Sequence, residues 1–128
     1  MSQPAPMPPL ATQLPVMDQA TLGEVRAMMG NKFTELLSYF LEDSASYVQQ
    51  IEEGIATGNA ESVVLPAHTL KSSAKQMGAM QLAESARTIE LAAREALKTQ
   101  GSLESIAPQM APLRVALEDV LHAYATLS

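Results

Sequence analysis

The sequence contains no cysteine, and this absence excludes several kinds of chemistry. A 128-residue chain without cysteine has no disulfide framework, no thiolate zinc site and no cysteine nucleophile. Such a chain is compatible with a reducing compartment, so we expect a cytoplasmic protein.

Positive charge and long apolar runs are also scarce. Eight Lys and Arg stand against 14 Asp and Glu, which gives a net charge of -6. Nucleic acids and anionic membrane surfaces favour a basic partner, so both are poor candidates. The central apolar run, residues 63–65, stops at Pro66 and falls well short of the roughly 20 residues that cross a bilayer. We therefore expect neither nucleic-acid binding nor membrane insertion.

Aromatic residues make up only 4% of the chain, and Ala, Leu, Met, Glu and Gln dominate, which favours helices. The length suits a single domain. Residues 1–16 hold five of the eight prolines and no charged residue. We predict a disordered Pro-rich leader over residues 1–16 and one folded domain over residues 17–128.

Apolar residues after Asp18 recur at helical spacing, and no segment alternates with period two. Gly30 ends the first segment, and Asn31 and Asn59 are candidate N-caps of the second and third. Helices are predicted over residues 18–29, 31–55, 59–77, 80–99 and 103–127. Because the connections are short, neighbouring helices run antiparallel. The predicted fold is all-α, an antiparallel four-helix bundle with a short N-terminal helix.

Three prolines lie inside these segments. Pro66 should kink the third helix, unless the regular helix begins only near Leu65. Pro108 and Pro112 leave two alternatives for the last helix, a start near Pro108 or a kinked first half.

Common catalytic motifs are missing. The sequence has no G-x-x-x-x-G-K-[ST] loop, no H-E-x-x-H and no G-x-S-x-G. Neither His68 nor His122 has Glu three residues before it, as a di-metal carboxylate bundle would require. We therefore expect no nucleotide site and no metal or other cofactor of its own. Glu90 and Arg94 have the spacing of an ordinary surface ion pair.

One histidine in the third helix has unusual neighbours. His68 lies about 140° from the centre of the apolar stripe on that helix, so its ring should face solvent. Lys71, Ser72 and Lys75 lie on the same side. A neutral imidazole is a nucleophile, and the two ammonium groups would offset the charge of a phosphoryl group attached to it. Exposed histidines are mostly ordinary surface residues, however, so spacing alone leaves both interpretations open.

The segment around His68 resembles the signature of histidine-containing phosphotransfer (HPt) domains, A-H-T-L-K-[GS]-S-[SA] followed by a hydrophobic residue, Gly and Ala. Here the match is AHTLKSSA at residues 67–74 and MGA at residues 77–79. The pattern F-x-x-L-L-x-x-F at residues 33–40, with Leu82 and Ile89-Glu90, is similar to the framework of the same family. The resemblance implies a four-helix bundle and a histidine phosphocarrier in two-component phosphorelays, without ATP binding or autokinase activity.

Residue by residue, the resemblance implies that His68 is the phosphoacceptor and Lys71 the cation that stabilises the phosphate. Ser72 is the small residue beside the histidine, where the family more often has glycine. Gln76 stands where the family often places a polar side chain that could orient the ring. Lys75 is added from its spacing alone, as a supporting charge.

The partners that the resemblance implies are receiver domains of a hybrid sensor histidine kinase and of a response regulator, with Mg²⁺ held by the receiver. We expect a monomer that docks through an apolar rim of Val64, Leu65 and Thr69, with residues of the first helix as further candidates. The alternative function is a non-catalytic helical adaptor that binds a receiver or kinase without carrying phosphate. The two differ in whether His68 is needed.

Overall fold

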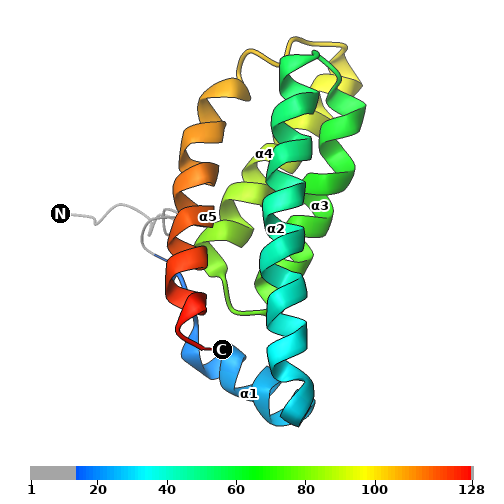
Figure 1. The fold of residues 1–128 in the computed structure, drawn as a ribbon. Coiled ribbons are helices and arrows are strands. Elements are labelled where there is room, and N and C mark those ends of the chain that lie inside the picture. The colour runs from blue at the N-terminus through cyan, green and yellow to red at the C-terminus, as the bar shows by residue number, and fades with distance from the viewer. Residues whose placement is uncertain (1–13, 128) are drawn as a thin grey trace, which may run out of the picture.

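The computed structural model describes residues 14–127, which form the all-α antiparallel four-helix bundle that the sequence predicts. Figure 1 shows α2–α5 side by side and α1 lying across one end of the bundle. The elements in chain order are α1 (Gln19–Met29), η2 (Gly30–Lys32), α2 (Phe33–Ala56), α3 (Ala60–Gln76), α4 (Met80–Thr99), η3 (Ala107–Gln109) and α5 (Met110–Ala125).

Side-chain caps explain where some of the helices begin. The Asn59 side chain accepts a hydrogen bond from the backbone N–H of Ser62 and caps α3, as predicted. Asp18 caps α1 in the same way, through the N–H of Thr21. The prediction of Asn31 as an N-cap is wrong. A 3₁₀ turn over Gly30–Lys32 leads directly into α2, whose first residue is Phe33.

The prolines are accommodated without breaking the bundle. Helix α3 is continuous from Ala60 and contains a buried Pro66, so the alternative start near Leu65 is wrong. Pro108 lies in the 3₁₀ turn η3. Pro112 lies in the first turn of α5, where backbone N–H groups have no partner within the helix. The last helix therefore starts just after Pro108, at Met110.

Part of the predicted leader is packed against the bundle. Residues 1–13 lie outside the described residues, but Leu14 and Pro15 contact the start of α4. The Gln81 side chain donates to the Leu14 carbonyl at 2.7 Å, and the Gln81 N–H donates to the Pro15 carbonyl at 3.2 Å. Val16 packs against the core. The packed structure thus begins before Met17.

The apolar stripe predicted for the third helix is buried throughout and fixes the rotation of α3. It consists of Val63, Ala67, Leu70, Ala74 and Met77. On α4 the apolar residues at helical spacing are buried from Leu82 to Ala93, whereas Leu97, which continues the same spacing, is exposed. The Tyr124 hydroxyl donates to the Met77 carbonyl at 2.7 Å and ties α5 to the end of α3. No helix within residues 14–127 is long and apolar enough to cross a membrane.

The structure explains why the MGA segment has a glycine at its centre. Gly78 has φ +78° in the turn between α3 and α4, a conformation that side chains rarely adopt. A Cβ there would lie 2.9 Å from the Asp18 carbonyl oxygen. The Gly78 carbonyl also accepts a hydrogen bond from the Asp18 N–H at 2.7 Å. This turn therefore holds α3, α4 and the start of α1 together.

Candidate functional site

His68 projects from the exposed face of α3, as its position relative to the buried stripe predicts. The stripe packs inward, so the opposite face of the helix is turned to solvent. The His68 side chain is 49% exposed. The ring is therefore accessible to another molecule, whereas the backbone of His68 is fixed in position by the packed helix.

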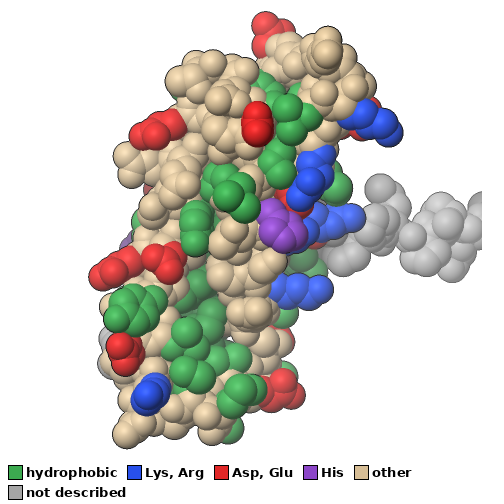
Figure 2. Space-filling view, turned by 90° about the vertical axis from the view of Figure 1, so that its right-hand side faces the viewer, with side chains coloured by type: hydrophobic (Ala, Val, Ile, Leu, Met, Phe, Trp, Pro, Cys, Tyr) green, Lys and Arg blue, Asp and Glu red, His purple; other side chains and the backbone are tan. Residues whose placement is uncertain are grey.

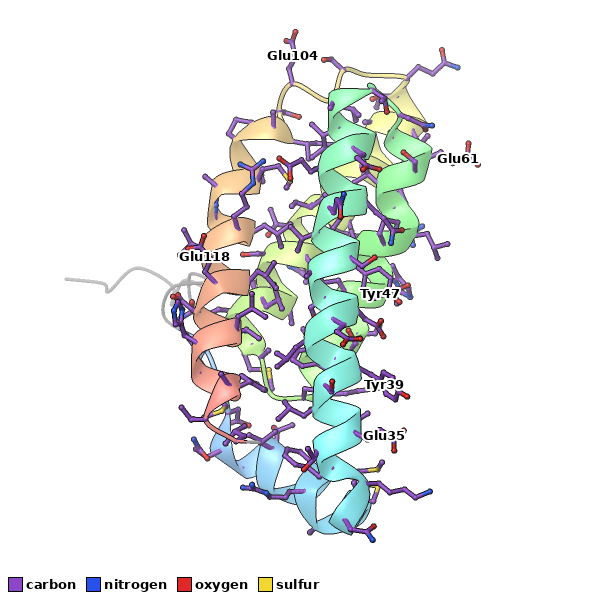
Figure 3. The ribbon with its side chains drawn as sticks, viewed as in Figure 1. Glu35, Tyr39, Tyr47, Glu61, Glu104 and Glu118 are labelled. Carbon is purple, nitrogen blue, oxygen red and sulfur yellow. The ribbon has the colours of Figure 1, made fainter. Side chains whose placement is uncertain are left out.

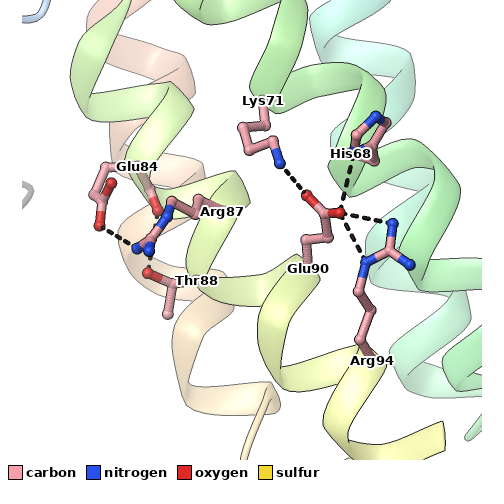
Figure 4. Close-up of polar contacts among 7 residues, drawn as sticks. All are labelled: His68, Lys71, Glu84, Arg87, Thr88, Glu90 and Arg94. Atoms are coloured by element: carbon pink, nitrogen blue, oxygen red, sulfur yellow. Dashed lines mark hydrogen bonds and ion pairs between the residues drawn. The ribbon is translucent and has the colours of Figure 1, made fainter.

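A buried carboxylate on the neighbouring helix holds this ring. Glu90 of α4 is only 5% exposed, and its Oε2 lies 3.0 Å from Nδ1 of His68 (Figure 4). Its Oε1 lies 2.7 Å from Nζ of Lys71. Arg94 approaches Oε2 with Nε at 2.9 Å and Nη2 at 2.8 Å. The prediction of an ordinary surface pair between Glu90 and Arg94 is therefore wrong, because Glu90 is buried and joins three side chains.

The hydrogen bond to Glu90 determines which ring nitrogen of His68 can react. Burial of the Glu90 carboxyl opposes its ionisation, but hydrogen bonds from Lys71, Arg94 and His68 outweigh this and lower its pKa to about 2. An ionised carboxylate only accepts hydrogen bonds, so Nδ1 of His68 carries the hydrogen. The lone pair of the neutral ring is then on Nε2, and the site can present it to an electrophile.

We expect the stability of the protein to depend on Glu90 in acid. Its pKa falls from 4.5 to about 2 on folding, so the ionised form adds about 3 kcal/mol of stability above pH ~4.5. That contribution is lost as the pH falls toward about 2, because both the folded and the unfolded chain then bind the proton. Urea unfolding of wild type and Glu90→Gln, followed by circular dichroism, should show their difference shrinking by about 3 kcal/mol between pH ~6 and ~2.

The matched control for this measurement is Glu61→Gln, an exposed glutamate in the first turn of α3. The difference in unfolding free energy between Glu61→Gln and wild type should stay small across the pH series. A Glu90→Gln difference that does not change with pH would contradict the assignment of Glu90 as the ionised centre of the site.

Basic side chains gather on one side of His68 although the protein is acidic. Lys71, Ser72, Lys75 and Arg87 line a hollow of about 420 Å³ beside His68, between α3 and α4. Figure 2 shows the blue side chains gathered next to the purple histidine. Arg87 pairs with Glu84 at 3.3 Å, whereas Lys75 has no salt bridge to any carboxylate in residues 14–127. The hollow suits a group with negative charge.

The structure brings most of the predicted site residues together, but not Gln76. Ser72 and Lys75 are exposed beside the hollow, as their spacing suggests. Gln76 lines a different hollow, between α1, α2 and α3. The side chain that orients the ring is Glu90, which the predicted site did not include. On the rim, Leu65 is 70% exposed, and Val64 and Thr69 are half-buried.

A signal for Glu90 is present in the sequence. It is four residues after Ala86 and seven after Ala83, so all three lie on one side of α4. Both alanines are buried. A carboxylate that continues an apolar stripe needs a cationic or donor partner on a facing helix. The sequence shows the charge at the edge of the buried face, but the partner becomes visible only when the helices are packed.

Comparisons with known proteins bear on the family and the fold. The model of the Hpt domain family matches residues 35–126. The crystal structure of histidine-containing phosphotransfer protein B (HptB) from Pseudomonas aeruginosa PAO1 superimposes with a TM-score of 0.80 at 21% sequence identity. The superposition covers 88% of this chain and 93% of the HptB chain. At this identity the likeness concerns the fold. None of the curated proteins compared with the chain matches it.

Proposed function

The chain belongs to the Hpt domain family, since the family model covers residues 35–126, and from this membership we propose that it is a histidine phosphocarrier of a multistep phosphorelay. Family membership gives it a phosphotransfer role in two-component signalling. The proposal adds that His68 accepts a phosphoryl group from the phospho-aspartate of one receiver domain and passes it to another receiver. The observation that carries it is the hydrogen bond between Nδ1 of His68 and the buried Glu90 at 3.0 Å.

In the proposed transfer, Nε2 of His68 attacks the phosphorus of the acyl phosphate. The N–P bond forms while the bond from phosphorus to the aspartyl oxygen breaks, and the receiver's aspartate leaves as a carboxylate. Nδ1 keeps its hydrogen, so the phosphorylated ring gains positive charge, and the Glu90 carboxylate lies 3.0 Å away to balance it. Passing the phosphoryl group to a second receiver reverses these steps. Neither step uses ATP or a cofactor of the carrier, and we expect the receiver to supply Mg²⁺.

The cations beside His68 have different parts in this proposal. Lys71 is held by Glu90 at 2.7 Å, so its ammonium group is positioned at the hollow and offsets the charge of the phosphoryl oxygens. Lys75 lines the same hollow without a carboxylate partner among residues 14–127 and adds charge. Ser72 is small enough to leave room for the incoming aspartyl phosphate. Leu65, with Val64 and Thr69, offers the apolar rim on which a receiver would rest.

The test is direct phosphorylation by a panel of radiolabelled phospho-receiver domains in the presence of Mg²⁺. We expect label on the purified protein that is lost in acid, survives alkali and maps to the peptide containing His68. His122, an exposed histidine on α5, provides an internal comparison. Label on His122 or on a hydroxyl side chain would contradict the proposal. Receivers that bind without transferring label would favour the adaptor.

A further inference from the structure

Ser72 is an exposed serine of α3 whose hydroxyl is not used by the fold. It lines the hollow beside His68. Its neighbour Ser73 differs, because the Ser73 hydroxyl donates to the Leu70 carbonyl at 3.3 Å within the same helix. The Ser72 hydroxyl has no hydrogen-bond partner among residues 14–127. It can therefore donate to a group that enters the hollow.

The Ser72 side chain lies on the flank of His68 that faces away from Glu90. At about 100° per residue, Lys71 is about 60° from His68 around α3, and Ser72 is about 40° away in the opposite direction. Lys71 contacts Glu90 at 2.7 Å, so Glu90 lies on the flank of Lys71. Glu90 holds Nδ1 of the ring at 3.0 Å (Figure 4), and the lone pair of Nε2 points away from the Nδ1–H bond. A group on Nε2 therefore projects on the flank of Ser72.

The spacing of four residues places the Ser72 side chain within reach of such a group. Residues at i and i+4 are neighbours on a helix, with about 5–6 Å between their Cβ atoms. Each Cα–Cβ bond of a helix tilts toward its N-terminus, so the Ser72 side chain leans toward His68. A phosphoryl group on Nε2 brings three strong acceptor oxygens into this gap.

The charges around the Ser72 hydroxyl favour a phosphoryl oxygen as its acceptor. Both lysines of the hollow attract an anion. The one acidic residue of α3, Glu61, is in the first turn of the helix, about 16 Å from Ser72 along the axis at roughly 1.5 Å per residue. Figure 3 shows Glu61 at the upper end of α3. Glu84 of α4 also lines the hollow, but it pairs with Arg87 at 3.3 Å.

We propose that Ser72 is a phosphoryl-binding residue, whose hydroxyl donates a hydrogen bond to an oxygen of the phosphoryl group on Nε2 of His68. This inference rests on the proposed function and deepens it. The hydrogen bond forms only once the phosphoryl group is on the ring, and its acceptor is charged, which strengthens it. It therefore stabilises the phosphorylated carrier and shifts the transfer equilibrium away from the phosphorylated receiver.

The test is the equilibrium of phosphoryl transfer with the receiver that labels the wild-type protein best. In Ser72→Ala we expect the ratio of phosphorylated carrier to phosphorylated receiver to fall by about 3- to 10-fold, the effect of losing one hydrogen bond at an exposed site. Ser72→Thr keeps the hydroxyl and should stay within about twofold of wild type. Receiver affinity for the unphosphorylated protein should not change. An unchanged or higher ratio in Ser72→Ala would overturn the inference, because truncating a side chain that only crowds the ring should favour transfer.

The matched control is Ser73→Ala on the same helix. The Ser73 hydroxyl is bonded to the Leu70 carbonyl, so its removal should leave the transfer ratio at the wild-type value. Equal losses in Ser72→Ala and Ser73→Ala would also overturn the inference, because they would reflect a general change in α3.

A second measurement needs no receiver and uses phosphoramidate as the probe. The bond from phosphorus to the ring nitrogen forms while the bond from phosphorus to the leaving nitrogen breaks, and ammonia is released. A hydrogen bond from Ser72 favours the doubly charged phosphoryl group, so the pKa of that group, followed by phosphorus NMR, should be higher in Ser72→Ala than in wild type. The other charged groups near it are the same in both proteins, namely Lys71, Lys75, Glu84, Arg87 and Glu90.

Phosphorylated His122 is the internal comparison, since it lies on α5, and its phosphoryl pKa should be the same in Ser72→Ala and wild type. If no receiver labels the wild-type protein, the proposed function fails. The inference about Ser72 is then decided by the phosphoryl pKa at His68 alone, and equal values in Ser72→Ala and wild type would refute it.

Discussion

Replacing His68 by Gln is expected to reduce phosphoryl uptake at least about 10³-fold, because the variant has no nucleophile to attack the acyl phosphate. The amide nitrogen of Gln is delocalised and has no basic lone pair. The His68 side chain is exposed, and its backbone belongs to a well-packed helix. Receiver binding should therefore match the wild type, and unfolding should reflect only the loss of the hydrogen bond to Glu90, roughly 1–3 kcal/mol. The measurement is single-turnover transfer of label from the preferred phospho-receiver, with affinity determined in parallel.

The matched control is His122→Gln. His122 is exposed on α5, where Nδ1 contacts only the Glu118 carbonyl among its described hydrogen-bond partners. We expect this variant to take up label as fast as wild type. Uptake that survives in His68→Gln would refute the carrier mechanism. If receiver binding disappeared along with uptake, the lost label could not be attributed to a missing nucleophile.

The second large effect is expected for Glu90→Ala, which should slow transfer at saturating receiver by about 10- to 100-fold, the usual cost of losing a partner that orients a reactive group. Without the carboxylate, no acceptor holds the hydrogen on Nδ1 of His68, and no charge balances the phosphorylated ring. Lys71 and Arg94 also lose their common anchor. Glu90→Gln should lie between wild type and Ala, because an amide oxygen still accepts a hydrogen bond but carries no charge.

A readout specific to positioning is the nitrogen chemical shifts of the His68 ring. In the wild type we expect the tautomer with hydrogen on Nδ1, and in Glu90→Ala a mixture of the two tautomers. Glu95→Ala, at an exposed position on α4, should leave both the shifts and the transfer rate unchanged. If Glu90→Ala kept the wild-type rate and tautomer, Glu90 would only stabilise the fold.

The parts of this protein that could be predicted from the sequence depend on periodicity along one helix. The buried stripe of α3 follows from spacings of three and four, and the outward direction of His68 follows from the stripe. The cap at Asn59 depends on residues within one turn. Leu97 fits the periodicity of α4 but is exposed. It lies in the last turn of that helix, and periodicity does not show how far the neighbouring helices cover it.

The features of the site that could not be predicted from the sequence depend on contacts between helices. Lys71 and Lys75 both share the side of His68 by spacing, but only Lys71 reaches Glu90 across the α3–α4 interface. The contact of Glu90 with Arg94, four residues away, can be predicted from spacing along α4. Its contact with His68, 22 residues away, cannot. The resemblance implies Gln76 at the ring, but Gln76 lies on another side of α3 and lines the hollow between α1, α2 and α3. Packing of α1 against α2 and α3 creates that hollow, and no local pattern encodes it.

The arrangement of the site within one helical hairpin has a consequence for folding kinetics. His68, Lys71, Glu90 and Arg94 all lie on α3 and α4, which are joined by the short connection 77–79. Closing so short a loop costs little entropy, and helical bundles rich in local contacts fold in microseconds to milliseconds. We expect the His68–Glu90 contact to form with this hairpin, early in folding. Destabilising substitutions in α1 or α5 should then mainly accelerate unfolding, without slowing assembly of the site.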